Sequence, residues 1–285
     1  MKKTIAVLGG DRRQIILATL LLEDGWKLMT WGLEKGDSPC SVPLDRALSA
    51  DILVFPLPVC RGQQLNLPLT DTRLAAPDLW SRLSAKHLLL GGSVGDLTQH
   101  LSEQYGLEIC DYYSREEVQV ANAIPTAEGA IMRMMEETEY TVQDSRCLVI
   151  GYGRIGKALS HRLQALGAAV TVAARKNSDL ALIRACGCRA VLTLDLKEKL
   201  GEYDAIFNTV PAQVLDETDF QLMRPGCLLV ELASFPGGFD IESVKRFDLR
   251  VIEERGLPGK VAPLSAARTI RDVIYKIFEE RGVEL

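Results

Sequence analysis

The sequence predicts an α/β protein made of two doubly wound parallel-sheet domains with a cleft between them. Short apolar segments alternate with longer amphipathic segments along the whole chain, as they do in successive β-α units. A predicted strand that runs into a glycine turn occurs twice, in "IAVLGGDRRQ" near the N-terminus and in "LVIGYGRIGKAL" at residues 148–159. At 285 residues the chain is long enough for two domains of ordinary size.

Composition and charge narrow the functional class. The chain is 47% hydrophobic and 25% charged, as globular proteins are, and its net charge of −5 provides no bulk attraction to nucleic acid or to an anionic membrane. Charged residues or glycines interrupt every apolar run, and "MKKTIAVLGG" is predicted to be a first strand rather than a signal peptide. The seven cysteines are scattered without framework or metal-site spacing. We therefore expect a cytoplasmic protein with reduced thiols and no metal.

The first half of the chain is predicted to form a substrate-binding domain over residues 1–122. Its strands are expected at residues 4–8, 27–30, 52–55, 88–90 and 108–111, and its helices at residues 12–23, 78–83 and 97–105. Prolines 56 and 58 end the third strand, and residues 57–77 are expected to form an irregular surface loop.

The second half is predicted to begin with a connecting helix over residues 123–142. Pro125 and Thr126 suit a helix start, with Glu128 in the first turn, where the helix dipole favours a negative charge. A second domain follows at residues 143–260, with strands at 146–150, 169–174, 189–192, 205–209, 227–232 and 249–252. The last helix, within residues 261–285, carries an apolar stripe and is expected to return to the first domain.

The second glycine turn predicts a Rossmann-like, dinucleotide-binding domain. Gly151, Gly153 and Gly156 have the G-x-G-x-x-G spacing, follow a predicted strand and open a predicted helix. Gly151 permits the tight turn, Gly153 lets a pyrophosphate approach the backbone, and Gly156 allows close packing of the helix on the sheet. The pyrophosphate is expected on the amides of the first helical turn, which includes Arg154 and Ile155. Glycines that only turn the chain are the alternative.

The end of the next strand favours NADP as the cofactor. An NAD site usually places Asp or Glu there, whereas here Arg175, Lys176 and Asn177 come before the first carboxylate, Asp179. Two cations suit a 2′-phosphate, although a solvated basic loop is the alternative. Two later strand ends are also expected to line the cofactor, and they contribute Asn208, Thr209, Val210, Pro211, Ala233 and Ser234.

Six motifs together resemble the family of dipicolinate synthase A subunits: "VLGGDRRQ", "NAIPTAEGAI", "GYGRIGKAL", "NTVPAQVL", "ELASFPGG" and "GLPGKVAP". They span nearly the whole chain in the family's order. The resemblance implies an NADP-dependent oxidoreductase in the mother cell of a sporulating bacterium. Its reaction would form dipicolinate (pyridine-2,6-dicarboxylate) from dihydrodipicolinate, beside the flavoprotein-like B subunit of dipicolinate synthase. Two positions depart from the family pattern, which often has Asp at position 231 and a basic residue at position 235, where this chain has Glu231 and Phe235.

Dipicolinate and its precursor are rigid dicarboxylates, so the first domain is expected to offer anion-binding groups. Arg13, at the start of the first helix, is the leading candidate, and the other expected substrate contacts are Ser93, Asn122 and Thr126. Glu128 and Asp11 are the candidate general bases. The alternatives are a first-turn helix charge for Glu128, a helix cap for Asp11 and a plain turn at Ser93.

Other classes of protein share parts of this sequence pattern. The two-domain plan also suits hydroxyacid, alanine and methylenetetrahydrofolate dehydrogenases, although a hydroxyacid enzyme would need a late catalytic histidine and none follows His161. A non-catalytic NADP-sensing protein is the rival from another class, and it predicts cofactor binding without turnover. The sequence is compatible with a homo-oligomer but does not predict one.

Overall fold

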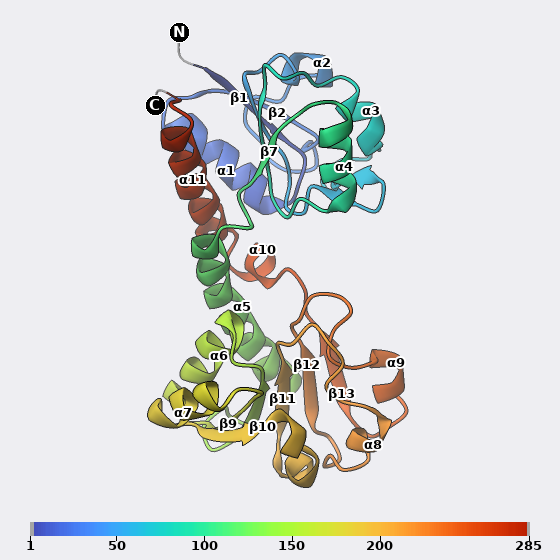
Figure 1. The fold of residues 1–285 in the computed structure, drawn as a ribbon, viewed down its shortest axis with the longest axis vertical. Helices are drawn as coiled ribbons and strands as arrows, with labels where there is room; N and C mark the ends of the chain where they lie inside the picture. The colour runs from blue at the N-terminus through green and yellow to red at the C-terminus, as the bar shows by residue number, and fades with distance from the viewer. Residues whose placement is uncertain (1–2, 284–285) are drawn as a thin grey trace. The chain divides into compact units, whose positions relative to one another are not determined.

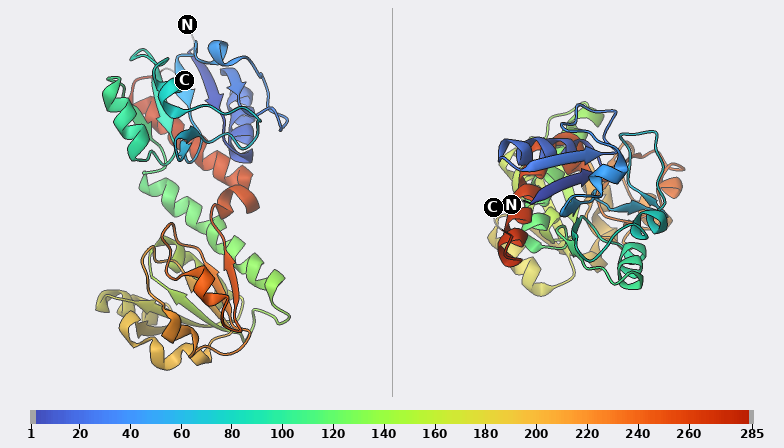
Figure 2. Two further views of the ribbon diagram at one scale, coloured as in Figure 1. Left: turned by 90° about the vertical axis from the view of Figure 1, so that its right-hand side faces the viewer. Right: turned by 90° about the horizontal axis from the view of Figure 1, so that it is seen from above.

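The computed structural model describes residues 3–283, which fall into two compact units (Figure 1). Asn122–Val261 form the second unit, and the described residues before and after that range form the first. Each unit is built on a parallel sheet covered by helices on both faces, which can be followed from a second direction in Figure 2. The predicted fold class, two Rossmann-like α/β domains, is confirmed in each unit taken by itself.

The sheet of the first unit has five parallel strands in the order β2-β1-β3-β6-β7. Their bounds are β1 Thr4–Leu8, β2 Lys27–Trp31, β3 Ile52–Val54, β6 Leu88–Gly91 and β7 Ile109–Asp111. The central strand β1 is an apolar run that is almost completely buried, as expected for a strand with helices on both sides.

Two helices cover one face of this sheet and three shorter ones cover the other. On the first face α1 (Arg12–Glu23) packs beside α11 (Pro263–Glu280), and the rings of Trp26 and Phe278 lie 5.3 Å apart there. On the other face lie α2 (Leu44–Ala47), α3 (Ala76–Trp80) and α4 (Asp96–Gln104). The observed bounds of α1 and β1 are those predicted from the sequence.

The expectation of an irregular surface loop at residues 57–77 was wrong in part. A short antiparallel hairpin forms there from β4 (Cys60–Arg61) and β5 (Gln64–Leu65). Val59 and Leu65 join the buried core. Periodicity over so few residues provides no signal, because the pairing depends on contacts with the rest of the unit.

The sheet of the second unit has six parallel strands in the order β10-β9-β8-β11-β12-β13. Their bounds are β8 Arg146–Ile150, β9 Ala169–Ala174, β10 Arg189–Leu192, β11 Ala205–Asn208, β12 Leu228–Glu231 and β13 Arg250–Glu253. One face carries α6 (Arg154–Ala165), α7 (Asn177–Ala185) and part of α5 (Glu116–Glu137), with α10 (Leu257–Val261) beside α5. The other face carries the 3-10 turns η1 (Thr193–Asp195) and η2 (Lys197–Glu202), with α8 (Glu217–Phe220) and α9 (Ile241–Val244).

Helix α5 begins earlier than predicted. It starts at Glu116, nine residues before Pro125, and keeps Pro125 inside the helix. A proline has no N–H for the carbonyl one turn back, so its position in the sequence was interpreted as a helix start. Glu128 therefore lies in the middle of the helix, and the helix-dipole argument for it no longer applies.

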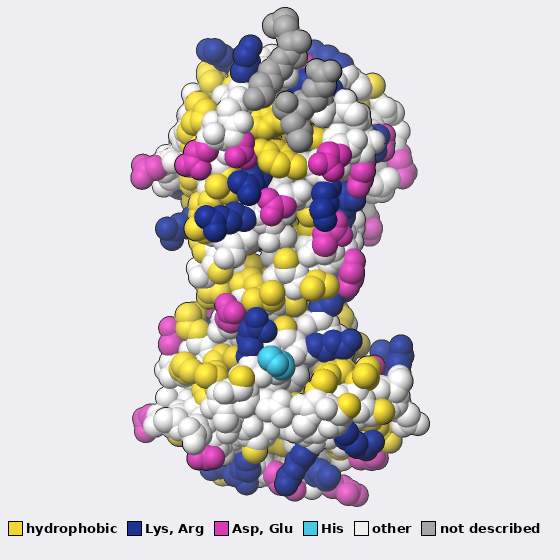
Figure 3. Space-filling model, turned by 90° about the vertical axis from the view of Figure 1, so that its left-hand side faces the viewer, with side chains coloured by type: hydrophobic (Ala, Val, Ile, Leu, Met, Phe, Trp, Pro, Cys, Tyr) yellow, Lys and Arg dark blue, Asp and Glu magenta, His cyan; other side chains and the backbone are white. Residues whose placement is uncertain are grey.

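The surface shows a mixture of charges. On the face drawn in Figure 3, Lys and Arg side chains are interspersed with Asp and Glu side chains and with hydrophobic ones. Within residues 3–283, no helix is both long enough and apolar enough to span a membrane.

Candidate dinucleotide-binding site

The turn between β8 and α6 contains two glycines that the fold itself requires. Gly151 has φ +100°, a conformation that L side chains rarely adopt, and its N–H donates to the Ala173 carbonyl of β9 at 2.9 Å. A Cβ at Gly156 would lie 2.1 Å from the Gly151 carbonyl oxygen. A side chain at Gly151 would also meet those of Thr209 and Val210, and one at Gly156 would push the first turn of α6 away from the glycine turn.

Gly153 differs from these two because the surrounding chain places no demand on it. Its φ of −79° and ψ of −163° suit any residue, and a Cβ there would meet no described heavy atom within 4 Å. Gly153 is the N-cap of α6, and no side chain in the described part of the protein caps this helix. As in any α-helix, the first-turn N–H groups have no carbonyl one turn earlier to bond, and the space beside Gly153 is open, which is the arrangement that binds a phosphate anion.

A pocket of about 980 Å³ adjoins this turn. It is formed by the segments that follow β8, β9, β10 and β11, whose carboxyl ends share one edge of the parallel sheet. The volume is at the upper end of the range for small-molecule sites, about 300–1,000 Å³, as a dinucleotide needs. Of the cofactor residues predicted from the sequence, those that line it are Gly151, Gly153, Arg175, Lys176, Thr209, Val210 and Pro211.

Arg175 and Lys176 reach the pocket from the end of β9. Neither side chain has an ion-pair partner in the part of the chain that the structure describes, and both belong to exposed residues. Asp179, from the first turn of α7, lines the same part of the pocket. Both the cations that favour a 2′-phosphate and a carboxylate that suits ribose hydroxyls are therefore present.

The remaining predicted cofactor residues lie outside the pocket lining. Arg154, Ile155 and Gly156 form the first turn of α6, Asn177 opens α7, Ala233 is buried, and Ser234 is exposed on the loop after β12.

Asn208 was expected to contact the cofactor, and in the structure its side chain bonds to neighbouring groups of the protein. The side chain is fully buried, and its Nδ2 donates to both carboxylate oxygens of Glu231, at 2.8 and 3.0 Å, and to the Val210 carbonyl at 2.9 Å. Its Oδ1 accepts the N–H of Val210 at 3.1 Å. With both side-chain polar atoms bonded within the protein, Asn208 joins the ends of β11 and β12.

Glu231 is the buried partner in this arrangement, and no role for it was predicted from the sequence. Besides Asn208 it accepts the backbone N–H groups of Ala233 and Gly238, at 2.8 and 2.7 Å. Burial raises the pKa of Glu231 above its usual value, and these hydrogen bonds act in the opposite direction. The carboxylate thereby fixes both ends of the loop at residues 232–238.

Sequence reasoning missed several residues that line the pocket. Tyr152 stands between the two turn glycines, with the Lys157 ammonium 5.3 Å from its ring centroid. Thr193, Leu194 and Lys197 reach the pocket from the segment after β10. That segment could have been found by counting strand ends, because the third strand of the unit ends at the same edge of the sheet as the glycine turn.

Asp11 and Arg13 form one cluster in the first unit. Asp11 is the N-cap of α1 and accepts the Arg13 backbone N–H at 3.0 Å. Its two oxygens also accept Nε and Nη2 of Arg13, at 2.9 and 2.7 Å. Nη2 donates further to the Leu57 carbonyl at 3.0 Å, and the Arg13 side chain is only 9% exposed. The helix-cap interpretation of Asp11 is therefore the one that the geometry supports.

Ser93 lies in a turn after β6 that is fixed by Asp111. Its φ is +55°, and its N–H and that of Val94 donate to the two carboxylate oxygens of Asp111, at 3.0 Å each. Asp111 ends β7, the neighbour of β6 in the sheet. Ser93 itself is exposed, so its side chain is available to a ligand.

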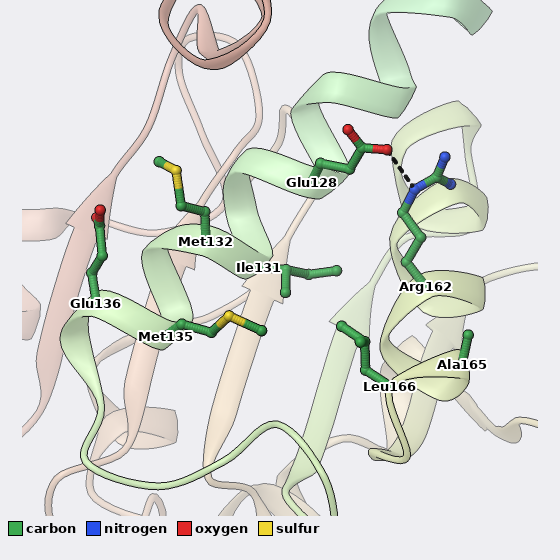
Figure 4. A pocket seen from close by; sticks show the side chains of 8 residues that line it. All are labelled: Glu128, Ile131, Met132, Met135, Glu136, Arg162, Ala165 and Leu166. Carbon is green, nitrogen blue, oxygen red and sulfur yellow. Dashed lines mark hydrogen bonds and ion pairs between the residues drawn. The ribbon is translucent and has the colours of Figure 1, made fainter.

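The predicted residues on α5 do not lie at the dinucleotide pocket. Asn122 and Thr126 are buried, and Thr126 Oγ1 donates to the Asn122 carbonyl at 2.7 Å. Glu128 forms an ion pair with Nε of Arg162 on α6 at 3.3 Å (Figure 4).

Glu128 and Arg162 border a separate, mainly apolar pocket of about 580 Å³ between α5 and α6. Met132 and Met135 line the same pocket (Figure 4), and it shares no lining residue with the dinucleotide pocket. Glu128, the candidate general base, therefore lies at this second pocket and not at the dinucleotide pocket.

Family models of known proteins match part of each unit. Residues 4–113 match the family model of the N-terminal domain of the dipicolinate synthase A subunit. Residues 112–234 match the model of the D-isomer specific 2-hydroxyacid dehydrogenase NAD binding domain. The second match covers the glycine turn and the pocket beside it, so this pocket belongs to a nicotinamide dinucleotide-binding domain of the dehydrogenase type.

Relatives along the whole chain agree with these matches. The A subunit of dipicolinate synthase from Bacillus subtilis (strain 168) is 29% identical over 98% of this chain and 97% of its own length. The crystal structure of the corresponding A subunit from Bacillus halodurans matches with a TM-score of 0.90 and 25% identity, over 97% of this chain and 98% of that one. The crystal structure of the dipicolinate synthase A chain from Bacillus subtilis matches with a TM-score of 0.87 and 28% identity, over 100% and 98%. Over nearly its whole length, this chain is therefore similar to the A subunits of dipicolinate synthase.

Proposed function

We propose that this chain is an NADP-dependent oxidoreductase subunit that converts dihydrodipicolinate into dipicolinate. The relatives from Bacillus subtilis and Bacillus halodurans support the product, because each is named as a dipicolinate synthase A subunit or chain. The observation that most supports a dinucleotide cofactor is the turn at Gly153, which is open at the N-terminus of α6 although nothing in the fold requires a glycine there.

The second unit holds the cofactor through two groups of residues. The first-turn amides of α6 bind the pyrophosphate, and Arg175 and Lys176 bind the 2′-phosphate. These cations follow β9, which lies on one side of β8, so the nicotinamide half extends to the other side, over the ends of β11 and β12.

When bound, NADP supplies the acceptor for a hydride. Dihydrodipicolinate gives up a hydride from one ring carbon and a proton from the ring, and the products are dipicolinate, NADPH and a proton. Formation of the aromatic ring favours this direction.

In the first unit, Arg13 is the proposed carboxylate-binding residue, and Ser93 is a further proposed contact. Asp11 and the Leu57 carbonyl fix the guanidinium through Nε and Nη2, which leaves Nη1 to bind an anion. Because both oxygens of Asp11 already accept bonds from Arg13, we assign Asp11 to positioning Arg13 rather than to proton transfer. Asn122 and Thr126, being buried, are assigned to the packing of α5.

NAD in place of NADP is the second candidate, and Asp179 in the pocket favours it. Titration of the chain with NADP and with NAD separates the two. Tighter binding of NADP, with a preference that Arg175→Gln removes, supports the 2′-phosphate site. Tighter binding of NAD, with a preference that Asp179→Asn removes, contradicts it.

The activity is tested with the purified chain, NADP and dihydrodipicolinate precursor formed in the same vessel by the aldolase from pyruvate and aspartate semialdehyde. Dipicolinate is followed by its ultraviolet absorption, with and without a flavoprotein-like B subunit. We expect dipicolinate only when both the chain and NADP are present. NADP binding without product in either mixture would instead support an NADP-sensing protein.

The relatives are named as subunits, and we propose that this chain likewise works with a B subunit in the mother-cell cytoplasm during sporulation. Co-purification of the two proteins from sporulating cells tests the pairing. Recovery of this chain alone would contradict it.

A further inference from the structure

Phe235 is an aromatic side chain that the core of its unit does not use. It lies on the loop after β12 and is 82% exposed, whereas the other six phenylalanines of the chain are buried or half-buried. An exposed ring contributes little of the stabilisation that burial gives to a phenylalanine. An exposed aromatic ring on a firmly held loop is instead available to a ligand.

The loop that carries Phe235 is fixed at both ends. Glu231 accepts the N–H groups of Ala233 and Gly238. The Gly238 carbonyl in turn accepts the N–H groups of Val214 and Leu215, at 2.7 and 3.1 Å, from the segment that follows β11. Residues 234–236, all exposed, project from this fixed base. A ring held in this way loses little conformational entropy when a ligand binds to it.

A cation lies next to the ring. The guanidinium carbon of Arg255 is 6.0 Å from the ring centroid of Phe235. Arg255 follows β13, the neighbour of β12, and its side chain remains 42% exposed while it pairs with Glu253 at 2.6 Å. Two adjacent strand ends thus present an aromatic face beside a positive charge.

Phe235 and Arg255 follow two neighbouring strands of the sheet, and the order of the strands indicates which part of the cofactor lies near them. Arg175 and Lys176 mark the adenosine side of the dinucleotide at β9, and β12 lies on the opposite side of β8. The loop after β12 is therefore on the nicotinamide side, where the reacting ring of the substrate must lie.

We propose that Phe235 and Arg255 form a substrate-binding surface for a planar ring that carries a carboxylate. The substrate ring stacks on Phe235, and one carboxylate binds Arg255. This inference rests on the proposed function and deepens it, because it assigns the recognition of ring planarity to two residues.

The test measures dissociation constants of three dicarboxylates by calorimetry, on the full chain saturated with NADPH. Pyridine-2,6-dicarboxylate is the product, benzene-1,3-dicarboxylate keeps the flat ring without its nitrogen, and heptanedioate is a flexible chain without a ring. Phe235→Leu should weaken both aromatic ligands roughly 2- to 12-fold and leave heptanedioate unchanged. Phe235→Tyr should restore the affinity for the aromatic ligands, and Arg255→Gln should weaken all three.

The matched control is Leu222→Ala, which changes another exposed apolar side chain of the same unit, 48% exposed and outside the dinucleotide pocket. It should leave all three dissociation constants unchanged. The NADPH affinity of Phe235→Leu should also equal that of the wild type.

Failure of this inference is distinguishable from failure of the proposed function. If the wild type forms and binds dipicolinate while Phe235→Leu binds all three ligands as the wild type does, the substrate surface is rejected and the function stands. A wild type that neither forms nor binds dipicolinate overturns both. A change in molar mass by light scattering on Phe235→Leu, with ligand affinities unchanged, would make the ring a contact between copies and would also reject the surface.

Discussion

Replacement of Gly153 by alanine tests cofactor binding independently of the stability of the fold. The added methyl group would stand in open space with respect to the protein, at a backbone conformation that alanine readily adopts. The loss of a glycine N-cap costs up to about 1 kcal/mol, and the restricted unfolded chain offsets about 0.4–1 kcal/mol. We therefore expect the free energy of unfolding to stay within about 1 kcal/mol of the wild type.

The effect of Gly153→Ala on the affinity for the cofactor should be much larger than its effect on stability. The methyl group would lie in front of the first-turn amides, where the pyrophosphate has to approach. A hydrogen bond to a charged group contributes roughly 1.5–3 kcal/mol, so the loss of one or two such bonds amounts to about 3 kcal/mol. That difference raises the dissociation constant of NADP roughly 100-fold.

The chain offers a matched control in Gly95. This glycine is the N-cap of α4, with φ −83°, ψ 173°, no side-chain cap and no described heavy atom within 4 Å of an added Cβ. Gly95→Ala should have the same small effect on stability and none on NADP binding. Gly156→Ala should instead destabilise the fold, because its Cβ would meet the Gly151 carbonyl.

The assay combines fluorescence titration of NADPH with thermal and urea unfolding of each variant. A Gly153→Ala protein that binds the cofactor within twofold of the wild type would refute the pyrophosphate assignment. A variant that loses binding only because it unfolds would contradict the claim that the fold has no need of this glycine.

Three further predictions concern other parts of the chain. Arg175→Gln should raise the dissociation constant of NADP about tenfold while leaving that of NAD within twofold, and equal losses would reject the 2′-phosphate contact. Arg13→Gln should raise the KM for dihydrodipicolinate at least tenfold without changing the affinity for NADP. Arg12→Gln, at an exposed neighbouring position, should change neither quantity. Equal kinetics for the two variants would show that Arg13 is not part of the substrate site. Burial lowers the pKa of His87 below its unfolded value of about 6.5, so the free energy of unfolding should fall as the pH drops below about 6.5 towards the folded pKa. In urea unfolding, His87→Asn should lack this part of the pH dependence. An identical pH dependence for the two proteins would show that His87 does not contribute.

Much of the fold follows from the sequence because its signals are local. The alternation of apolar strands with amphipathic helices predicted the observed bounds of β1, α1, β8, β9 and β10. Helix α5 was placed wrongly because a proline carries the same local signal at a helix start and inside a helix whose packing overrides it. The β4–β5 hairpin was missed because its pairing depends on tertiary contacts rather than on periodicity.

The residues of the candidate site also fall into those with a local sequence signal and those that depend on distant parts of the chain. Gly151, Gly153 and Gly156 are recognisable because the backbone geometry and the ligand both act within six residues. The role of Asn208 depends on Glu231, 23 residues further along the chain, and no local pattern shows that this carboxylate takes up the amide. Glu128 was chosen as a candidate general base from its sequence motif. Its ion pair with Arg162 joins two different helices, so the motif alone could not show it.

The central claim is that this chain oxidises dihydrodipicolinate with NADP, and the stoichiometry of a single reaction tests it most directly. NADPH and dipicolinate would be measured together in one vessel, by fluorescence and by chromatography, for the wild type and for Gly153→Ala. The account predicts that the wild type forms the two products in equal amounts and that the variant at low NADP forms neither. Dipicolinate without NADPH, or equal rates for the two proteins, would contradict it.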